Sequence, residues 1–282
     1  MAAIPDVDEV LIEEVPVNDE KIGSGSIAMV TINRPNKLNA LNNTVVSALK
    51  QTCQWVEEND DIRLMIIQGS KPEPPAEGKR AKPKSFVAGA DISEFVGKDS
   101  KEIRKSFEGN AWEAIWNLSK PTIAMVDGFA LGGGLEVALS CDLRIVSEDS
   151  RFATPEINLG LIPGGGGTQR LSRLVGYGKA MEMVMGGEMI NAEEALAIGL
   201  VNHVHSSEKL EEATLLLARN IASKSPHTLK VAKATIRAAL EQPLEKGISI
   251  EADAFAGLFD SEDKEIGVKA FLERKDPEWV GR

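Results

Sequence analysis

Short apolar runs alternate with amphipathic segments through most of the chain. Residues 27–33 (IAMVTIN) and 64–68 (LMIIQ) are β-branched or apolar runs that are typical of buried strands. Between them, residues 42–58 repeat apolar positions at helical spacing and place one face together, namely Val45, Val46, Leu49, Cys53 and Val56. This order predicts a β-α-β start to an α/β fold.

The same alternation returns after residue 120. Residues 122–126 (TIAMV) and 143–146 (LRIV) predict two more strands, with a short helix at 133–141 between them. Two further helices are expected at 178–185 and 192–198. The pattern therefore predicts an α/β core over residues 1–205.

The pattern becomes helical throughout from Ser207. Leu210, Leu216, Leu217 and Ile221 form one apolar face, and Pro226 follows Ser225 at a position that suits the first residue of a helix. Residues 248–259 and 266–274 supply two more helical segments. We therefore expect a helical C-terminal region over residues 206–282.

Two segments depart from this pattern. Residues 1–24 form an acidic N-terminal segment, with seven acidic residues and no basic one in the first 20, which is the opposite of a signal or transit peptide. Residues 71–84 (KPEPPAEGKRAKPK) contain four prolines and five basic against two acidic residues. That composition predicts a surface loop, either disordered or functional.

Composition narrows the classes of function. The chain has 282 residues, 43% of them hydrophobic, which is enough to bury a large core. Its net charge of −11 opposes a phosphate backbone or an anionic membrane, so no nucleic-acid or membrane partner is expected. No apolar run reaches the ~20 residues of a membrane span. Two cysteines are too few for a disulfide framework, and we expect a reducing cytoplasm.

Glycine-rich segments followed or preceded by glutamates are the main chemical signal. Gly132–Gly134 leads into Glu136, and Glu156 precedes Gly164–Gly167; a third segment, 88–92 (AGADI), follows an expected strand end. Glycines bring backbone amides close to a ligand, and carboxylates move protons. The three segments predict a site that binds an oxyanion through amides and acts on it with carboxylates.

Other interpretations of these residues remain open from the sequence alone. In the alternative interpretation the glycines serve only close packing of a strand on a helix. Glu136 is then a favourable charge at a helix N-terminus worth ~0.3–1 kcal/mol, and Glu156 is an exposed loop residue. Spacing does not show that the two glutamates meet. A phosphate cradle is disfavoured, because Val137 occupies the third glycine position of a dinucleotide motif and residues 164–170 lack the Lys-Ser/Thr of a P-loop.

The remaining reactive residues support no other chemistry. His203 and His205 would share one face of a strand without a third ligand, and His227 lies in an expected helix, so no metal site is predicted. Cys53 and Cys141 lie in apolar settings that suit core residues. The sequence has no Gly-x-Ser-x-Gly nucleophile elbow.

Three ordered motifs resemble the crotonase superfamily, the enoyl-CoA hydratases and isomerases. They are residues 85–95 (SFVAGADISEF), 128–145 (GFALGGGLEVALSCDLRI) and 152–171 (FATPEINLGLIPGGGGTQRL), and residues 33–41 (NRPNKLNAL) add to them. The resemblance runs from about residue 27 to 275. It implies a ClpP-like α/β spiral of ββα units with a helical C-terminal trimerisation region, usually in a hexamer built as a dimer of trimers.

The resemblance also implies roles for individual residues. The oxyanion-hole amides match Ala90 and Gly133, and the acid/base carboxylates match Glu136 and Glu156. Contacts to the coenzyme A of an acyl-CoA substrate match a longer set, which is Leu38, Ala88, Gly89, Ala90, Asp91, Ile92 and Gly133. Phe255, Phe271 and Lys275 resemble residues that a neighbouring subunit offers to the nucleotide. The loop at 71–84 is longer than most relatives have there.

Retention of both glutamates points to a hydratase among the activities of this superfamily. The expected reaction is reversible addition of water to a short-chain 2-enoyl-CoA such as crotonyl-CoA, or dehydration of 3-hydroxybutyryl- or 3-hydroxypropionyl-CoA, with no cofactor besides the coenzyme A of the substrate. An isomerase or a thioester hydrolase on the same scaffold is the second hypothesis. An RNA-binding protein that keeps the fold is a third, which the charge of −11 disfavours.

Overall fold

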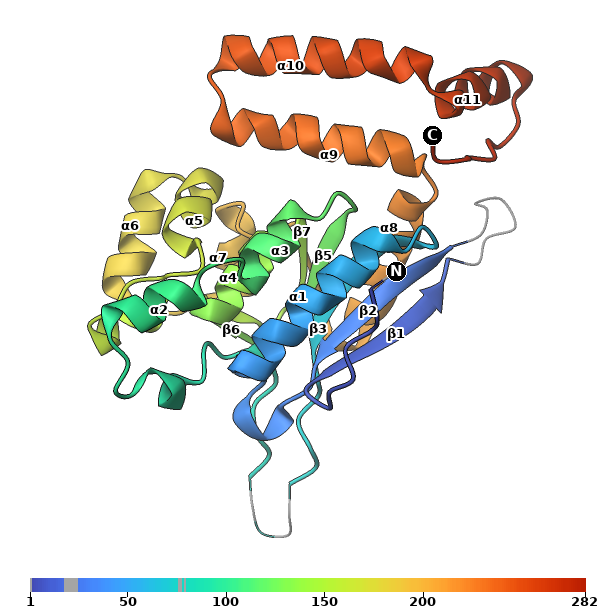
Figure 1. Cartoon of the computed structure of the whole chain (residues 1–282). Helices are drawn as coiled ribbons and strands as arrows, with labels where there is room; N and C mark the ends of the chain where they lie inside the picture. Colours follow the sequence, from blue (N-terminus) through green and yellow to red (C-terminus); the bar gives the residue numbers. More distant parts are fainter. Residues whose placement is uncertain (1, 18–24, 76–77, 79) are drawn as a thin grey trace.

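The main sheet has six strands in the order β1-β2-β3-β5-β7-β10 (Figure 1). The computed structural model describes residues 2–17, 25–75, 78 and 80–282. Within them, all neighbouring strands of this sheet run parallel except β1, which is antiparallel to β2. The strands are β1 (Val10–Pro16), β2 (Ser26–Ile32), β3 (Ile62–Gly69), β5 (Thr122–Val126), β7 (Leu143–Ser147) and β10 (His203–His205).

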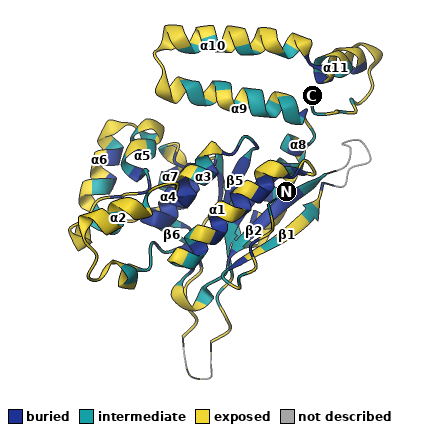
Figure 2. Ribbon diagram, viewed as in Figure 1, coloured by how far each residue is buried: buried dark blue, intermediate teal, exposed yellow. Residues whose placement is uncertain are grey.

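Alternate residues of the sheet face two different hydrophobic clusters. On β2, Ala28, Val30 and Ile32 pack toward α1 (Asn43–Glu58), whereas Ile27 and Met29 pack toward α8 (Ser207–Ala222). Parallel strands covered by helices on both faces read as nearly continuous apolar runs, which is why they were detectable in the sequence. Figure 2 shows the same arrangement as dark blue strands beneath helices that are yellow on their outer side.

A second, smaller sheet positions the glycine-rich segments. Its order is β4 (Ser85–Val87), β6 (Phe129–Leu131), β8 (Arg151–Ala153) and β9 (Ile190–Asn191), and the first three strands are parallel. The chain leaves β4 into residues 88–91, β6 into Gly132 and β8 into Thr154. Because the carboxyl ends of parallel strands meet at one edge, the three segments converge there.

Short helices surround this edge. The two 3-10 helices η1 (Pro35–Lys37) and η2 (Ile92–Phe95) flank the first segment, and η3 (Pro155–Leu159) carries Glu156. The α-helices between the sheets and the C-terminal region are α2 (Ser100–Ser106), α3 (Ala111–Asn117), α4 (Gly133–Ser140), α5 (Gly167–Val175), α6 (Tyr177–Gly186) and α7 (Ala192–Ala197). The predicted helices at 133–141, 178–185 and 192–198 are confirmed.

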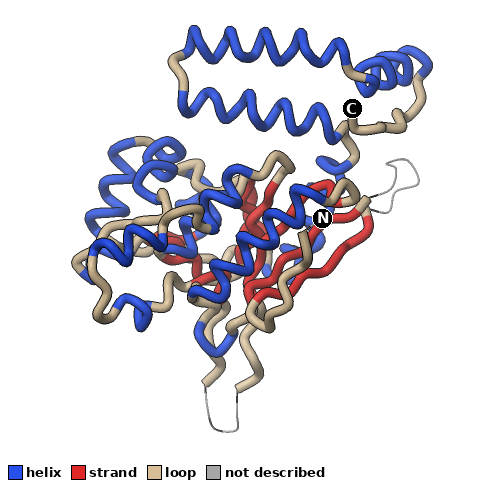
Figure 3. The backbone as a smooth tube through the Cα atoms, viewed as in Figure 1, coloured by secondary structure: helices blue, strands red, loops and turns tan. Residues whose placement is uncertain are grey.

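The C-terminal helices stand beyond the core as a separate layer (Figures 1 and 3). They are α9 (Pro226–Glu241), α10 (Leu244–Gly257), the 3-10 helix η4 (Leu258–Asp260) and α11 (Glu262–Glu273). Pro226 does open α9, and the Ser225 hydroxyl accepts a hydrogen bond from the Thr228 amide. The last residues fold back, because the Val280 amide donates to buried Asp263 over 2.8 Å.

The N-terminal segment forms a strand that the sequence analysis did not expect. Seven residues of β1 pair with β2 along its whole length. Glu13 and Glu14 are exposed on this edge strand. They interrupt the apolar alternation that predicts a strand, but the hydrogen bonds between the backbones of β1 and β2 do not require that alternation. Residues 18–24 of the acidic segment lie outside the described residues.

The basic loop contains no helix or strand in its described part. The Lys82 ammonium donates to the Asn36 carbonyl over 2.9 Å, and Lys84 pairs with Asp127 at 3.1 Å. Lys79 lies outside the described residues. No helix in the described part of the chain has the length and apolar character to cross a membrane.

Candidate active site

Helix α4 packs so closely on β4 that Gly134, in its first turn, has no room for a side chain. A Cβ on Gly134 would lie 2.0 Å from the Val87 carbonyl oxygen. Gly132 has a φ of +50°, a conformation that side chains disfavour. Gly134 is therefore required for close packing of a helix on a strand, one of the two interpretations of this glycine run. The same close approach brings the start of α4 to the end of β4.

Two amides lie side by side where α4 meets the segment after β4. Leu41 forms a bridge to this segment, donating to the Gly89 carbonyl over 2.8 Å and accepting from the Asp91 amide over 2.7 Å. The Ala90 amide between them makes no backbone hydrogen bond among the described residues, and neither does that of Gly133. A Cβ on Gly133 would lie 3.6 Å from the Ala90 nitrogen. Two adjacent free donors can stabilise negative charge that develops on a bound oxygen.

Glu136 is buried in the first turn of α4, with 2% of its surface exposed. Its Oε1 accepts a hydrogen bond from the Gly167 amide over 2.7 Å. Burial raises the pKa of Glu136 to about 7, repulsion from Glu156 adds to the rise, and the Gly167 and Gly165 amides oppose it. A favourable charge at a helix N-terminus does not describe this residue, because burial outweighs the amides. A carboxylate with a pKa near neutrality suits general acid/base chemistry.

Glu156, on η3, lies close enough to Glu136 to raise the pKa of that carboxyl. The segment that the sequence left irregular is this 3-10 helix, and Glu156 is half-buried on it rather than exposed. Its Oε1 would lie 2.8 Å from a Cβ on Gly132. Its Oε2 is buried and has no hydrogen-bond partner among the described residues, and burial raises the pKa of this carboxyl. The structure thus brings together the two glutamates that spacing alone did not connect.

The second glycine run fits around the Glu136 carboxylate. A Cβ on Gly165 would lie 2.7 Å from the Trp112 ring and 2.9 Å from Glu136 Oε2. On Gly167 it would lie 2.8 Å from Glu136 Oε1. The sequence singled out this run but not its partner, since no motif marks Trp112, whose indole donates to the Gly133 carbonyl over 3.0 Å.

The expected coenzyme contacts fall into two groups. Leu38 lies beside the first segment, where its carbonyl accepts from the Ala88 amide over 3.1 Å, and Asp91 is fixed by Arg34 at 3.0 Å. Phe255 and Phe271 are exposed on α10 and α11, in the layer beyond the core (Figure 1). Lys275 pairs with Glu273 at 2.8 Å. The structure does not bring this second group to the glutamates of its own chain.

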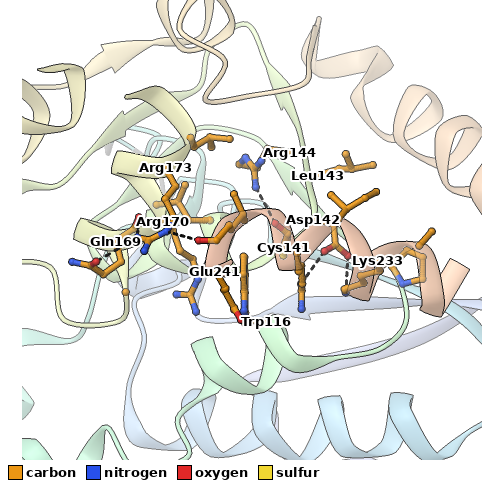
Figure 4. A pocket seen from close by; sticks show the side chains of 18 of the residues that line it. Trp116, Cys141, Asp142, Leu143, Arg144, Gln169, Arg170, Arg173, Lys233 and Glu241 are labelled. Carbon is orange, nitrogen blue, oxygen red and sulfur yellow. Dashed lines mark hydrogen bonds and ion pairs between the residues drawn. The ribbon is translucent and has the colours of Figure 1, made fainter. Parts of the chain in front are cut away.

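A cavity of about 730 Å³ lies between α9 and the core beside α4 and α5 (Figure 4). Its walls include Trp116, Asp142, Arg170 and Lys233, but neither catalytic candidate. The two candidate acid/base glutamates therefore lie outside this cavity. The cavity remains a contact zone between the core and the C-terminal layer.

The two cysteines are core residues, as their apolar settings predicted. Cys53 and Cys141 are free and buried, and burial raises the pKa of both thiols. The rings of His203 and His205 lie 6.3 Å apart on β10. Among the described residues, no group of three or more His, Cys, Asp or Glu side chains is arranged to hold a metal ion.

Comparison with known proteins finds one family over almost the whole chain. A family described as enoyl-CoA hydratase/isomerase matches residues 23–282. The chain is 41% identical to the short-chain-enoyl-CoA hydratase of Clostridium acetobutylicum, over 89% of this chain and 93% of that protein. It is 38% identical to the crotonyl-CoA hydratase of Syntrophomonas wolfei, over 91% and 95%.

Solved structures give the same result for the fold. An enoyl-CoA hydratase subunit from Geobacillus kaustophilus superposes with a TM-score of 0.85 at 34% identity, covering 97% of this chain and 98% of that one. An enoyl-CoA hydratase from Bacillus anthracis gives a TM-score of 0.86 at 31% identity, over 97% and 100%. The spiral α/β fold with a helical C-terminal region is therefore confirmed.

Proposed function

The chain belongs to the enoyl-CoA hydratase/isomerase family, and from that premise we propose that it adds water to short-chain 2-enoyl-CoA thioesters. The product is a 3-hydroxyacyl-CoA, and the same site catalyses the reverse dehydration. One observation carries the proposal: buried Glu136, with its pKa raised to about 7, faces Glu156 beside the free amides of Ala90 and Gly133.

The amides supply the first half of the chemistry. The thioester oxygen of the substrate accepts hydrogen bonds from the Ala90 and Gly133 amides, which draw electron density from the conjugated double bond. The β-carbon becomes electrophilic, and the enolate charge that develops on the oxygen is stabilised. One donor of this kind is worth ~2.7–4 kcal/mol of the barrier.

The glutamates supply the second half. A water molecule between them loses a proton to Glu136 as its oxygen bonds to the β-carbon, and Glu156 gives a proton to the α-carbon. Their surroundings support this division of roles, since the Gly167 amide favours ionised Glu136 whereas Glu156 Oε2 has no donor among the described residues. Proton transfer between the pair and solvent restores the starting state. The reaction requires no cofactor besides the coenzyme A of the substrate.

The preference for short chains rests on the relatives. Proteins named short-chain-enoyl-CoA hydratase and crotonyl-CoA hydratase are 41% and 38% identical to this chain. Crotonyl-CoA is therefore the first substrate in hydration, and 3-hydroxybutyryl- and 3-hydroxypropionyl-CoA are the first in dehydration. A cytoplasmic location remains part of the proposal and rests on the two free cysteines.

Assembly is a further part of the proposal. The C-terminal layer exposes large apolar side chains, including Leu244, Ile248, Phe255, Phe271 and Leu272. Exposed apolar surface of this extent marks a protein contact. A second copy would cover it, and a hexamer of two trimers would bring Phe255, Phe271 and Lys275 to the nucleotide bound by a neighbour.

The test is a turnover panel over acryloyl-, crotonyl- and longer enoyl-CoA substrates, run in both directions. The proposal predicts loss of the enoyl thioester absorbance with crotonyl-CoA and no release of free coenzyme A. Movement of the double bond without water uptake would identify an isomerase. Release of free coenzyme A would identify a hydrolase, and either result would overturn the proposal.

A further inference from the structure

Arg170 contacts the glycine run that encloses Glu136. It lies on α5, and its Nη1 donates to the Gly165 carbonyl over 2.7 Å. The other side of Gly165 packs against the Trp112 ring and Glu136 Oε2, so closely that a Cβ would meet both within 3 Å. The position of this peptide relative to Glu136 is thus set by a ring on one side and a guanidinium on the other.

The same guanidinium connects the site to the C-terminal layer. The Cζ atom of Arg170 lies over the Trp116 ring, 4.8 Å from its centroid, and that of Arg237 lies 4.2 Å from the same centroid. Trp112 and Trp116 are one turn apart on α3 and therefore share a face. Helix α3 thus contacts Gly165 through one tryptophan and both arginines through the other.

Arg237 is itself anchored to the core. It belongs to α9, and its Nη2 donates to Asp142 Oδ1 over 2.8 Å, while Lys233 of α9 pairs with Asp142 Oδ2 at 2.7 Å. Asp142 also accepts from the Thr122 amide over 2.8 Å. A continuous set of contacts therefore runs from the seat of α9 on the core to the carbonyl of Gly165. Arg170, Trp116, Asp142 and Lys233 line the cavity between them (Figure 4).

We propose that Arg170 is a positioning residue that holds the Gly164–Gly167 run against Glu136, and that Arg237 and Trp116 couple its position to the seating of α9. The kinetic test of this role rests on the proposed function, whereas the titration of Glu136 does not. The C-terminal layer would then have a second role besides assembly, because displacement of α9 would loosen the peptide that packs against the Glu136 carboxylate.

The charged residues around Glu136 and Arg170 determine which measurement can distinguish an effect on Glu136 from an effect on stability alone. Glu136 is faced by Glu156 from η3 and by Arg170 from α5. Arg170 in turn is faced by Glu136, by Arg237 of α9 and by Glu113 of α3. The positive charge of Arg170 favours ionised Glu136, so its removal raises the pKa of that carboxyl further. A role confined to structure would leave this pKa unchanged.

The test uses the full-length enzyme with four variants: Arg170→Gln, Arg170→Lys, Arg237→Gln and the Arg170→Gln/Arg237→Gln double. Arg173→Gln is the matched control, since Arg173 lies on the same helix and donates to the Leu240 carbonyl of α9 but makes no contact with the glycine run among the described residues. Circular dichroism checks folding. Each protein is assayed for kcat and KM with crotonyl-CoA across pH, and Glu136 is titrated by ¹³C NMR, with Glu136→Gln used to assign its signal.

In Arg170→Gln we expect kcat to fall roughly 10–100-fold with KM within about threefold, since displacement of a catalytic group by 1 Å costs on this order. The acid limb of kcat/KM should move to higher pH, together with the Glu136 titration. Arg170→Lys should return the limb toward the parent but recover only part of kcat, because lysine keeps the charge without the planar fork. Arg237→Gln should lower kcat less, and add little in the double variant.

Three results would overturn the proposal: an unchanged kcat in Arg170→Gln, losses that multiply in the double variant, or a Glu136 titration that moves as much in Arg173→Gln as in Arg170→Gln. A lowered melting temperature with an unmoved acid limb would assign Arg170 to stability alone. If the parent hydrates no enoyl-CoA, the proposed function fails, whereas the NMR titration still decides whether Arg170 controls Glu136.

Discussion

The glutamate site buries polar groups, whereas the C-terminal layer exposes apolar ones. Glu136 is 2% exposed and Glu156 Oε2 is buried without a partner among the described residues, while Phe271 and Leu272 on α11 are 83% and 76% exposed. Each is the costly arrangement for its kind of side chain in an isolated subunit. We attribute the buried carboxylates to proton transfer in the proposed reaction. We attribute the exposed apolar side chains to contact with a second copy of the chain.

The two regions also differ in how their backbone is fixed. Around Glu136, glycines leave no space for a Cβ against Val87, Trp112 or the carboxylate itself. In the C-terminal layer, a Cβ on Gly247 or Gly257 would meet nothing within 4 Å, whereas one on Gly267 would lie 2.9 Å from the Trp279 ring. Substitutions should therefore act on turnover in the first region and on association in the second.

The largest expected effect lies in the site. Glu136→Gln and Glu156→Gln should each lower kcat roughly 10²–10⁴-fold in a folded protein that still binds acyl-CoA, because each removes one proton-transfer group. Steady-state hydration of crotonyl-CoA measures the loss. Glu211→Gln, an exposed position on α8, is the control. Near-normal turnover in either site variant would show that the substituted glutamate is not needed for proton transfer.

The cost of burying Glu136 should be visible as a pH-dependent stability. Its pKa is raised from 4.5 to about 7, so the native state binds a proton more tightly than the unfolded chain in this window. Stability is therefore lost as pH rises from about 4.5 to about 7, by roughly 3 kcal/mol. Denaturant unfolding at one protein concentration should show Glu136→Gln more stable than the parent at pH 8 but equal to it at pH 4.5. A difference that does not change with pH would refute the burial argument.

Substitution on the exposed face should alter assembly and leave the site intact. Phe271→Glu places a charge in the expected contact, which should weaken association by roughly 2 kcal/mol, the scale of an interface hot spot. Light scattering across protein concentration measures this, with Leu216→Glu, at an exposed leucine of α8, as the control. Truncation after Ser206 is a harsher test, since α8 packs on the sheet and its loss would uncover Ile27 and Leu64. Unchanged assembly of Phe271→Glu would exclude α11 from the contact.

The smallest effect concerns the basic loop, which belongs to neither region. If it guides coenzyme phosphates, replacing Lys71, Lys79 and Arg80 by serine should raise KM a few-fold at low ionic strength, leave kcat unchanged and have no effect near 0.15 M salt and above. Lys82 and Lys84 are kept because they bind Asn36 and Asp127. Lys209→Ser/Lys246→Ser, at remote exposed lysines, is the control. Equal KM values at low salt would leave the loop a linker.

Most of the fold could be predicted because its strands are buried on both faces and its helices are amphipathic. The predicted ranges 64–68, 122–126 and 143–146 lie within β3, β5 and β7, and the range 27–33 overlaps β2 but extends one residue past its end. β1 was missed because an edge strand is held by backbone pairing, and its glutamates hide the pattern. Hydrophobic periodicity also could not show that α8 packs on the sheet.

The sequence predicted the glycines and glutamates of the site but not the residues that pack around them. The glycine runs marked α4 and the loop at Gly164–Gly167, since only glycine permits such close approach. That Glu136 and Glu156 face each other depends on two strands that end at one sheet edge, which spacing does not show. Trp112 and Trp116 lie outside the quoted motifs, and Arg170 lies within residues 152–171 but the motif gives it no role. All three make contacts between distant segments, which a sequence pattern does not show.

Isotope incorporation tests the central claim most directly. Crotonyl-CoA is incubated with the enzyme in H₂¹⁸O and, separately, in D₂O, and the product is examined by mass spectrometry and NMR. We expect 3-hydroxybutyryl-CoA with ¹⁸O at the β-carbon and one deuterium at the α-carbon. Glu136→Gln and Glu156→Gln should incorporate both labels roughly 10²–10⁴-fold more slowly. Deuterium without ¹⁸O, ¹⁸O in a free carboxylate, or double labelling by either variant at the parent's rate would contradict this expectation.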